Sequence, residues 1–120
     1  NGSFAATTKT FRIEHPTKED HYLFHSAVET PTAGDNIYRF TVSTVNNKCS
    51  VPLDEYIQVL NENIMIWVSP KEHFGNAYGV VSYNTLEVTS NEDGVYNVLC
   101  IGTRKDPAAK VSWKGHDIHK

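Results

Sequence analysis

Along Ile37-Tyr38-Arg39-Phe40-Thr41-Val42-Ser43-Thr44, aromatic or aliphatic side chains alternate with polar ones from Tyr38 to Ser43. This two-residue period predicts an extended strand with Tyr38, Phe40 and Val42 on one face and polar side chains on the other. A strand with one buried and one solvated face is typical of antiparallel sheets. We therefore expect an antiparallel β domain to be built around this segment.

Similar segments precede and follow this one, and short turns rich in Pro, Gly, Asn and Asp separate them. Residues 64–69 and 95–103 are apolar on both sides, which predicts central strands that are buried on both faces. Short connections favour antiparallel neighbours. The expected strands are residues 10–14, 22–29, 37–44, 48–53, 64–69, 77–83, 85–89, 95–103 and 111–114.

One short helix is expected within this series, from residue 54 to about residue 61. Asp54 can cap its amino end, and an apolar stripe follows at helical spacing. The stripe consists of Leu53, Tyr56, Ile57 and Leu60. The sequence therefore predicts an all-β fold, an antiparallel β-sandwich or jelly-roll-like domain with one short helix.

Length and charge narrow the class of protein. The 120 residues suit one domain, and the net charge of -3 argues against a nucleic-acid module, which carries a basic patch. No apolar run is long enough to insert into a membrane, and no signal peptide is visible. We expect a linker or tail over residues 1–8, a single β domain over 9–114 and a polar tail over 115–120.

Histidines are the first candidates for chemistry, since the chain has six. His21 and His25 share one face of a strand, but no Cys or acidic residue at ligand spacing completes a zinc set. They are weak metal candidates, and structural roles are favoured. His25 also precedes Ser26, yet adjacent strand residues point to opposite faces, and no G-x-S-x-G motif is present. We expect no enzyme and no cofactor, and a small metallo- or hydrolytic enzyme is the weakest hypothesis.

Four other side chains are candidates for ligand binding. Arg104 and Lys105 follow the longest strand segment and can meet an anion, although pairing of Arg104 with Asp106 or with a carboxylate of a neighbouring chain is the favoured alternative. Phe74 is expected in a loop and Tyr83 at a hairpin tip. Aromatic rings at such places can stack on a sugar or anchor a protein interface.

Other aromatic and sulfur-containing side chains are expected inside the domain. Trp67 and Tyr96 lie in strongly apolar segments and are predicted to pack in the core. Cys100 also lies in an apolar run and is expected to pack as a small hydrophobic residue. A disulfide between Cys49 and Cys100 would require neighbouring strands and is not favoured.

Several segments together resemble a module of tail-fibre or appendage proteins of phages and large viruses. The pattern combines F-x-I-x-H-P, L-x-H-S-x-x-E-x-P, I-Y, L-P-x-Y, L-N and G-x-R-x-D, in this order. This chain has Val-Pro-Leu-Asp-Glu-Tyr where the module tends to Leu-Pro-x-Tyr, and Cys-Ile-Gly where it often has Thr-Gly. The matching segments are residues 9–16, 22–31, 36–38, 51–56, 60–61 and 101–107.

The resemblance implies a virion structural domain, with a homotrimer favoured, near the distal end of a fibre. Such a domain would act in fibre assembly, or would contact a host-surface glycan or protein as a receptor-binding module at the tip. We favour the structural role, because the matching residues lie mostly on strands and turns. The module often lies near a self-cleaving intramolecular chaperone, but its cleavage signature is absent here and no autoproteolysis is expected.

Overall fold

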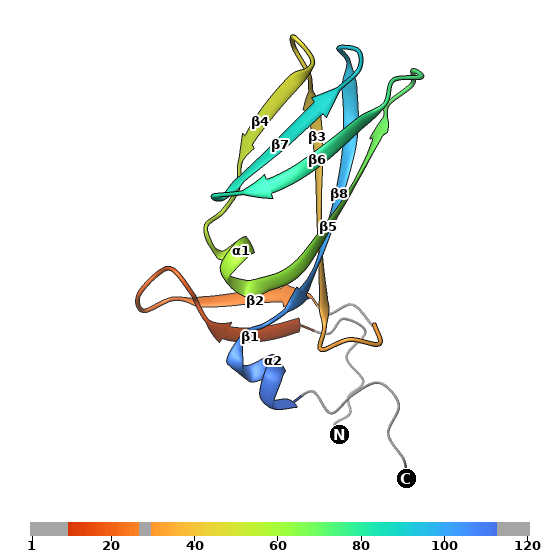
Figure 1. Cartoon of the computed structure of the whole chain (residues 1–120). Helices are drawn as coiled ribbons and strands as arrows, with labels where there is room; N and C mark the ends of the chain where they lie inside the picture. The colour runs from red at the N-terminus through yellow and green to blue at the C-terminus, as the bar shows by residue number, and fades with distance from the viewer. Residues whose placement is uncertain (1–9, 27–29, 113–120) are drawn as a thin grey trace.

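A computed structural model describes residues 10–26 and 30–112, which form eight strands and two short helices (Figure 1). The all-β prediction is confirmed. Among the predicted strands, residues 27–29 and 113–114 lie outside the described ranges. The elements are β1 (Thr10–Glu14), β2 (Tyr22–Ser26), β3 (Asp35–Ser43), β4 (Lys48–Pro52), α1 (Tyr56–Leu60), β5 (Asn61–Pro70), β6 (Ala77–Ser82), β7 (Thr85–Ser90), β8 (Val95–Arg104) and α2 (Pro107–Ser112).

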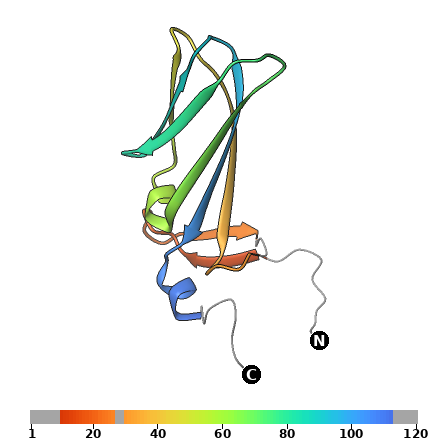
Figure 2. The same ribbon diagram turned by 45° about the vertical axis from the view of Figure 1, so that its right-hand side comes forward.

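Two three-stranded antiparallel sheets form the sandwich. One has the strand order β3-β8-β5 and the other β4-β7-β6, while β1 and β2 form a separate hairpin. The long strands β3, β5 and β8 extend past the shorter sheet and reach the hairpin at one end of the molecule (Figures 1 and 2). Helix α1 lies between the shorter sheet and the hairpin, and α2 follows β8 beside the hairpin.

The core lies between the two sheets. Every strand of the sandwich turns alternate side chains inward, and those of the central strands β7 and β8 are the most deeply buried. Tyr96 is fully buried, as predicted. Cys49 and Cys100 lie on facing sheets as free thiols, and burial raises the pKa of Cys100. The buried cluster consists of Val42, Leu86, Val88, Tyr96, Val98 and Cys100.

The two segments that are apolar on both sides differ in position. Strand β8 is central, as predicted, because β3 and β5 pair with its two edges. The same prediction is wrong for residues 64–69, since among the described strands β5 pairs only with β8 and forms an edge of its sheet. Trp67 was also predicted to lie in the core, but it points away from the sandwich and is 50% exposed. The outward apolar side chains of β5 therefore form a surface.

The turn at Asn46-Asn47, between β3 and β4, joins the two sheets. Val45 and Lys48 exchange backbone hydrogen bonds across it, and both asparagines have positive φ angles of 52° and 68°. Strand β3 then pairs with β8, while β4 pairs with β7. By contrast, the predicted hairpin at Tyr83-Asn84 joins two paired neighbours, β6 and β7.

Both helices differ in detail from the prediction. Helix α1 begins after Glu55, which makes no side-chain capping bond, so the predicted cap at Asp54 is wrong. Residues 107–112 form α2, where a last strand was expected from residue 111. Pro107 occupies the first helical position, and the Asp106 carboxylate accepts the Ala109 N–H at 3.2 Å. This start signal outweighs the β-forming residues that follow.

Candidate functional site

The four predicted ligand-binding residues lie in three separate places. Phe74, 99% exposed, follows β5, and Tyr83, 95% exposed, lies in the β6–β7 turn. Arg104 ends β8 and Lys105 follows it. Asn61 pairs with Arg104 at the start of β5, whereas Phe74 follows the other end, about 30 Å away for a strand of this length. These side chains therefore do not form one pocket.

Arg104 is already engaged by a carboxylate of its own chain. Its Nε and Nη2 donate to the two oxygens of Asp106 at 2.9 and 2.8 Å, which confirms the predicted pair. Burial would raise the pKa of Asp106, but the hydrogen bond and charge of Arg104 hold it below its usual value. Lys105 is exposed, and its backbone N–H donates to the Leu60 carbonyl. An anion would have to displace Asp106 to reach Arg104.

The weak metal candidates point to different partners. His21 Nδ1 lies 2.6 Å from the Glu19 carbonyl, whereas His25 Nε2 lies 3.1 Å from the Tyr38 hydroxyl. Within residues 10–26 and 30–112, no three His, Cys, Asp or Glu side chains gather as metal ligands. Burial lowers the pKa of His25; the hydrogen bond to Phe24 opposes this, and the charge of Arg104 adds to it. The neutral imidazole is therefore favoured.

A polar chain, here called the hairpin junction, ties β2 to the sandwich. Asn36 donates to Asn61 Oδ1 at 2.8 Å, and Asn61 donates to the Tyr38 hydroxyl at 3.1 Å. The Tyr38 hydroxyl donates to His25 Nε2 when His25 Nδ1 donates to the Phe24 carbonyl, so one tautomer satisfies every bond. Burial raises the pKa of Tyr38 to about 12, so it stays protonated as a donor.

Aromatic edges complete the hairpin junction. The Tyr56 ring of α1 meets His15 and His25 of the hairpin in T-shaped contacts, with centroids 5.6 and 5.8 Å apart. On β8, Gly102 packs so closely on Asn61 that an added Cβ would lie 2.7 Å from the Asn61 Cβ. Short motifs far apart in sequence therefore meet at this junction.

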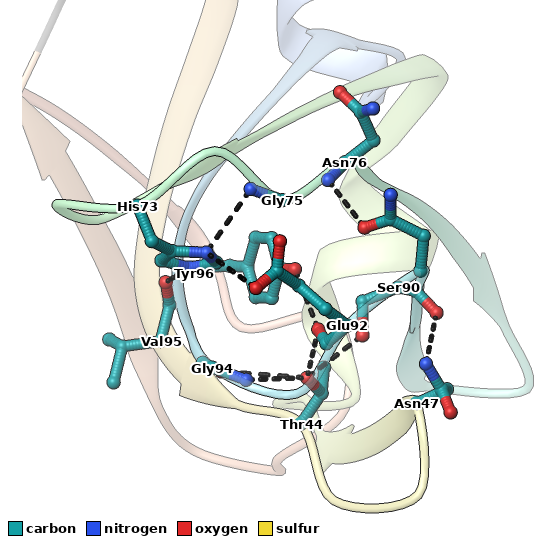
Figure 3. A network of polar contacts seen from close by, with 11 residues as sticks. Thr44, Asn47, His73, Gly75, Asn76, Ser90, Glu92, Gly94, Val95 and Tyr96 are labelled. Atoms are coloured by element: carbon teal, nitrogen blue, oxygen red, sulfur yellow. Dashed lines mark hydrogen bonds and ion pairs between the residues drawn. The ribbon is translucent and has the colours of Figure 1, made fainter.

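At the other end of the sandwich, a second polar network joins the loops (Figure 3). His73 Nε2 donates to the Val95 carbonyl at 3.0 Å, and its Nδ1 accepts the Gly75 N–H at 3.2 Å. Ser90 donates to the Thr44 hydroxyl, which itself lies near the Gly94 backbone. Both ring nitrogens of His73 are occupied by backbone groups, so the network fixes loops and provides no free base beside a nucleophile.

The outward side of the β3-β8-β5 sheet, here called the apolar outer face, was not predicted. Cross-strand pairing places Ile37, Ile101 and Met65 in one row, and Arg39, Leu99 and Trp67 in the next. Met65 is 60% exposed, and the central Leu99 and Ile101 are half-buried. A shallow hollow of about 690 Å³ crosses this face. The signal in the sequence was the apolar character of β5 and β8 on both sides.

The outward side of the β4-β7-β6 sheet, here called the polar outer face, is the natural comparison. One of its rows contains Lys48, Thr89 and Tyr78, and the next contains Ser50, Glu87 and Val80. Its first row thus also has a cation at one edge and an aromatic ring at the other. The two faces differ mainly along the central strand, where Thr89 and Glu87 replace Leu99 and Ile101.

Comparisons with known proteins provide no relative for this chain. No protein-family model matches it, and no curated protein or solved structure matches it significantly. Neither helix in the described part of the chain is long and apolar enough to cross a membrane. The functional argument therefore rests on the geometry and on the resemblance of the sequence motifs.

Proposed function

We propose that this chain is a structural domain of a viral, phage-like tail fibre or appendage, and that it acts in fibre assembly as a homotrimer in the virion. The observation that supports the proposal most is the hairpin junction. His15, His25, Tyr38, Asn61 and Gly102 come from separate matching motifs, yet they lie in one place, where His25, Tyr38, Asn61 and Gly102 form a chain of contacts and Tyr56 links His15 to His25. The motifs thus act as a unit that holds the fold together.

The polar side chains of the hairpin junction and of Arg104 form hydrogen bonds within the chain. His25, Tyr38, Asn61 and Arg104 each bond to another described residue of the chain. Buried and mutually satisfied polar groups specify one arrangement of a core and leave little capacity for a ligand. We therefore assign these residues to the architecture and propose no catalytic step.

The oligomeric state tests this proposal. Sedimentation equilibrium of the purified chain should give a mass three times the 13.5 kDa of one copy, over a wide range of concentrations. A domain that joins fibre subunits has to associate with its own copies, so a monomer at millimolar concentration would contradict the proposal. Asn61→Ala provides a second test, because it removes the junction and should lower thermal stability without removing any outward side chain.

A receptor-binding module for a host glycan or protein is the alternative. The hollow on the apolar outer face places Trp67 near hydroxyl and amide groups of Thr41, Ser69 and Asn97, which suits a sugar ring. A glycan array should then give a binder that is lost in Trp67→Ala. A binder lost in Phe74→Ala or Tyr83→Ala would place recognition at the exposed tips, and an array without any binder would contradict host-glycan attachment.

A further inference from the structure

We propose that copies of this chain contact one another through the apolar outer face, with Arg39 of one copy lying on the Trp67 ring of the next. This inference rests on the proposed assembly function and names the surface that performs it. The occupant of the face is therefore a second copy of the chain.

The composition of the face is that of the centre of a protein interface. Interface centres are enriched in aromatic residues, Met and Arg, and depleted of Lys, Glu and Asp. The two central rows contain Trp67, Met65 and Arg39 with three aliphatic side chains and no other charge. Apolar side chains gathered on an exposed face in this way are typical of a contact site.

The face has no partner within the described part of the chain. The side chains of Arg39 and Trp67 make no hydrogen bond or ion pair with residues 10–26 or 30–112. The opposite sides of the same strands already fill the core through Phe40, Ile66 and Val98. The outward side chains therefore cannot turn inward to escape water, and no segment within residues 10–26 or 30–112 pairs with them.

The arrangement of the rows is self-complementary. Arg39 lies at the β3 edge and Trp67 at the β5 edge of the same row, and Ile37 and Met65 occupy the same edges of the next row. A rotation axis parallel to the strands keeps each row at its height. It therefore brings Arg39 onto Trp67 of the neighbouring copy and Ile37 against its Met65, with Leu99 near the axis.

Two carboxylates, those of Asp35 and Glu62, lie at one end of the face. The Asp35 carboxylate accepts hydroxyl bonds from Thr32 and Thr103 at 2.7 and 2.8 Å, and Glu62 pairs with Lys110 at 3.1 Å. Lys110 therefore compensates the charge of Glu62 within each copy, and the two hydroxyl bonds hold the Asp35 carboxylate in place without cancelling its charge. At the opposite end of the rows, Thr41, Asn97 and Ser69 form a polar rim, which is the usual border of an interface.

The polar outer face shows why a cation and an aromatic ring alone are insufficient. Lys48 and Tyr78 also lie at opposite edges of one row, but Thr89 and Glu87 occupy the strand between these edges. Burying Glu87 against a second copy would desolvate its carboxylate. The apolar centre selects one face, and Arg39 with Trp67 then sets how neighbouring copies align.

A pair of matched variants tests the choice of face. Trp67→Ala and Tyr78→Ala each remove an outward aromatic ring from an edge strand, and the rings are 50% and 62% exposed. We expect Trp67→Ala to raise the dissociation constant of the assembly about tenfold or more, as for an interface hot spot. Tyr78→Ala should leave it unchanged within about twofold. Circular dichroism checks that both variants fold.

Covalent trapping tests the alignment without weakening the contact. Thr41 and Ser69 lie at opposite edges of one rim row, and β8 separates them within a copy, too far apart for a disulfide. We expect T41C/S69C, in a Cys49→Ser background, to form linked dimers and trimers under a mild oxidant. Each single variant should form no linked trimer, since Cys100 is buried and the one exposed cysteine of each copy can join only two copies.

The outcomes separate this inference from the proposed function. An assembly that resists Trp67→Ala and gives no linked species in T41C/S69C would overturn the inference and leave the assembly function standing. A monomeric wild-type chain would overturn both. Loss of the assembly in Tyr78→Ala but not in Trp67→Ala would show that the polar outer face is the contact and would also overturn the inference.

Discussion

The two outer faces of the sandwich are built by the same rules and differ in what they expose. Each face covers three antiparallel strands, and each has a cation and an aromatic ring at the edges of one row. The polar outer face places Thr89 and Glu87 on its central strand, as a solvated surface does. The apolar outer face places Leu99 and Ile101 there. Inward side chains therefore define the sandwich, and the outward ones distinguish the face that we propose as the contact between copies.

A substitution in the core between the two sheets should have the largest effect on the free energy of unfolding. Leu86 is fully buried between the sheets, so Leu86→Ala leaves a cavity that neither sheet can fill. We expect a loss of about 2–5 kcal/mol in the free energy of unfolding, measured by chemical denaturation at a fixed protein concentration. A loss below about 1 kcal/mol would mean that the sheets do not pack closely here, and that the two faces are not parts of one sandwich.

Exchanging the central side chains tests the comparison itself. Leu99→Glu would bury an unpaired carboxylate in the proposed contact, which costs about 3 kcal/mol or more per copy. We expect the assembly to dissociate to monomers in sedimentation experiments. The matched change Glu87→Leu on the polar outer face should leave the assembly constant within about twofold. Equal effects of the two variants would show that the faces do not differ in function.

Arg39, the cation at the edge of the apolar outer face, should contribute less to the stability of the assembly than Leu99 at the centre. Arg39→Ala removes the guanidinium that we place on Trp67 of the neighbouring copy, and a cation–π contact is worth about 0.5–2 kcal/mol. The assembly constant should fall by about two- to thirtyfold, as followed by light scattering during dilution. Lys48→Ala is the control on the polar outer face. If Lys48→Ala weakens the assembly as much as Arg39→Ala, the assignment of the contact is wrong.

The smallest effect on stability is expected from the ionisation of Tyr38, whose side chain lies on the inward side of β3, opposite Ile37 and Arg39. An unfolded tyrosine ionises near pH 10, whereas burial raises the pKa of Tyr38 to about 12. The unfolded state therefore releases its proton first, so the contribution of Tyr38 is complete below about pH 10 and declines between pH 10 and 12. Tyr38→Phe should flatten this decline in unfolding experiments. An unchanged slope would place Tyr38 in contact with water.

The sequence predicted local features well. Alternation at residues 37–44 assigned the inward side of β3, and the Tyr83-Asn84 turn, the burial of Tyr96 and the Arg104–Asp106 pair are all present. Each depends on residues close in sequence or on a simple period. The exposure of Phe74 and Tyr83 also follows from turn chemistry, although neither residue gathers a site around it.

The remaining features depend on contacts between distant segments. Alternation does not say which strands become neighbours, so the change of sheet at Asn46-Asn47 was not foreseen. An apolar pattern on both sides of a strand has two meanings, because burial at the centre of a sheet and exposure at a contact surface look alike in sequence. Trp67 was assigned to the core for this reason. The hairpin junction likewise needed the fold, since Asn61 lies 23 positions after Tyr38 in the sequence.

Oxidation of the one methionine tests the central claim most directly. Met65 is the only methionine of the chain, and it is 60% exposed on the apolar outer face of a single copy. Peroxide converts an accessible methionine to its sulfoxide, which mass spectrometry follows. We expect slow oxidation in the assembled protein, and fast oxidation after dilution to monomers or in Leu99→Glu. Equally fast oxidation in the assembled and monomeric protein would show that copies do not meet on this face.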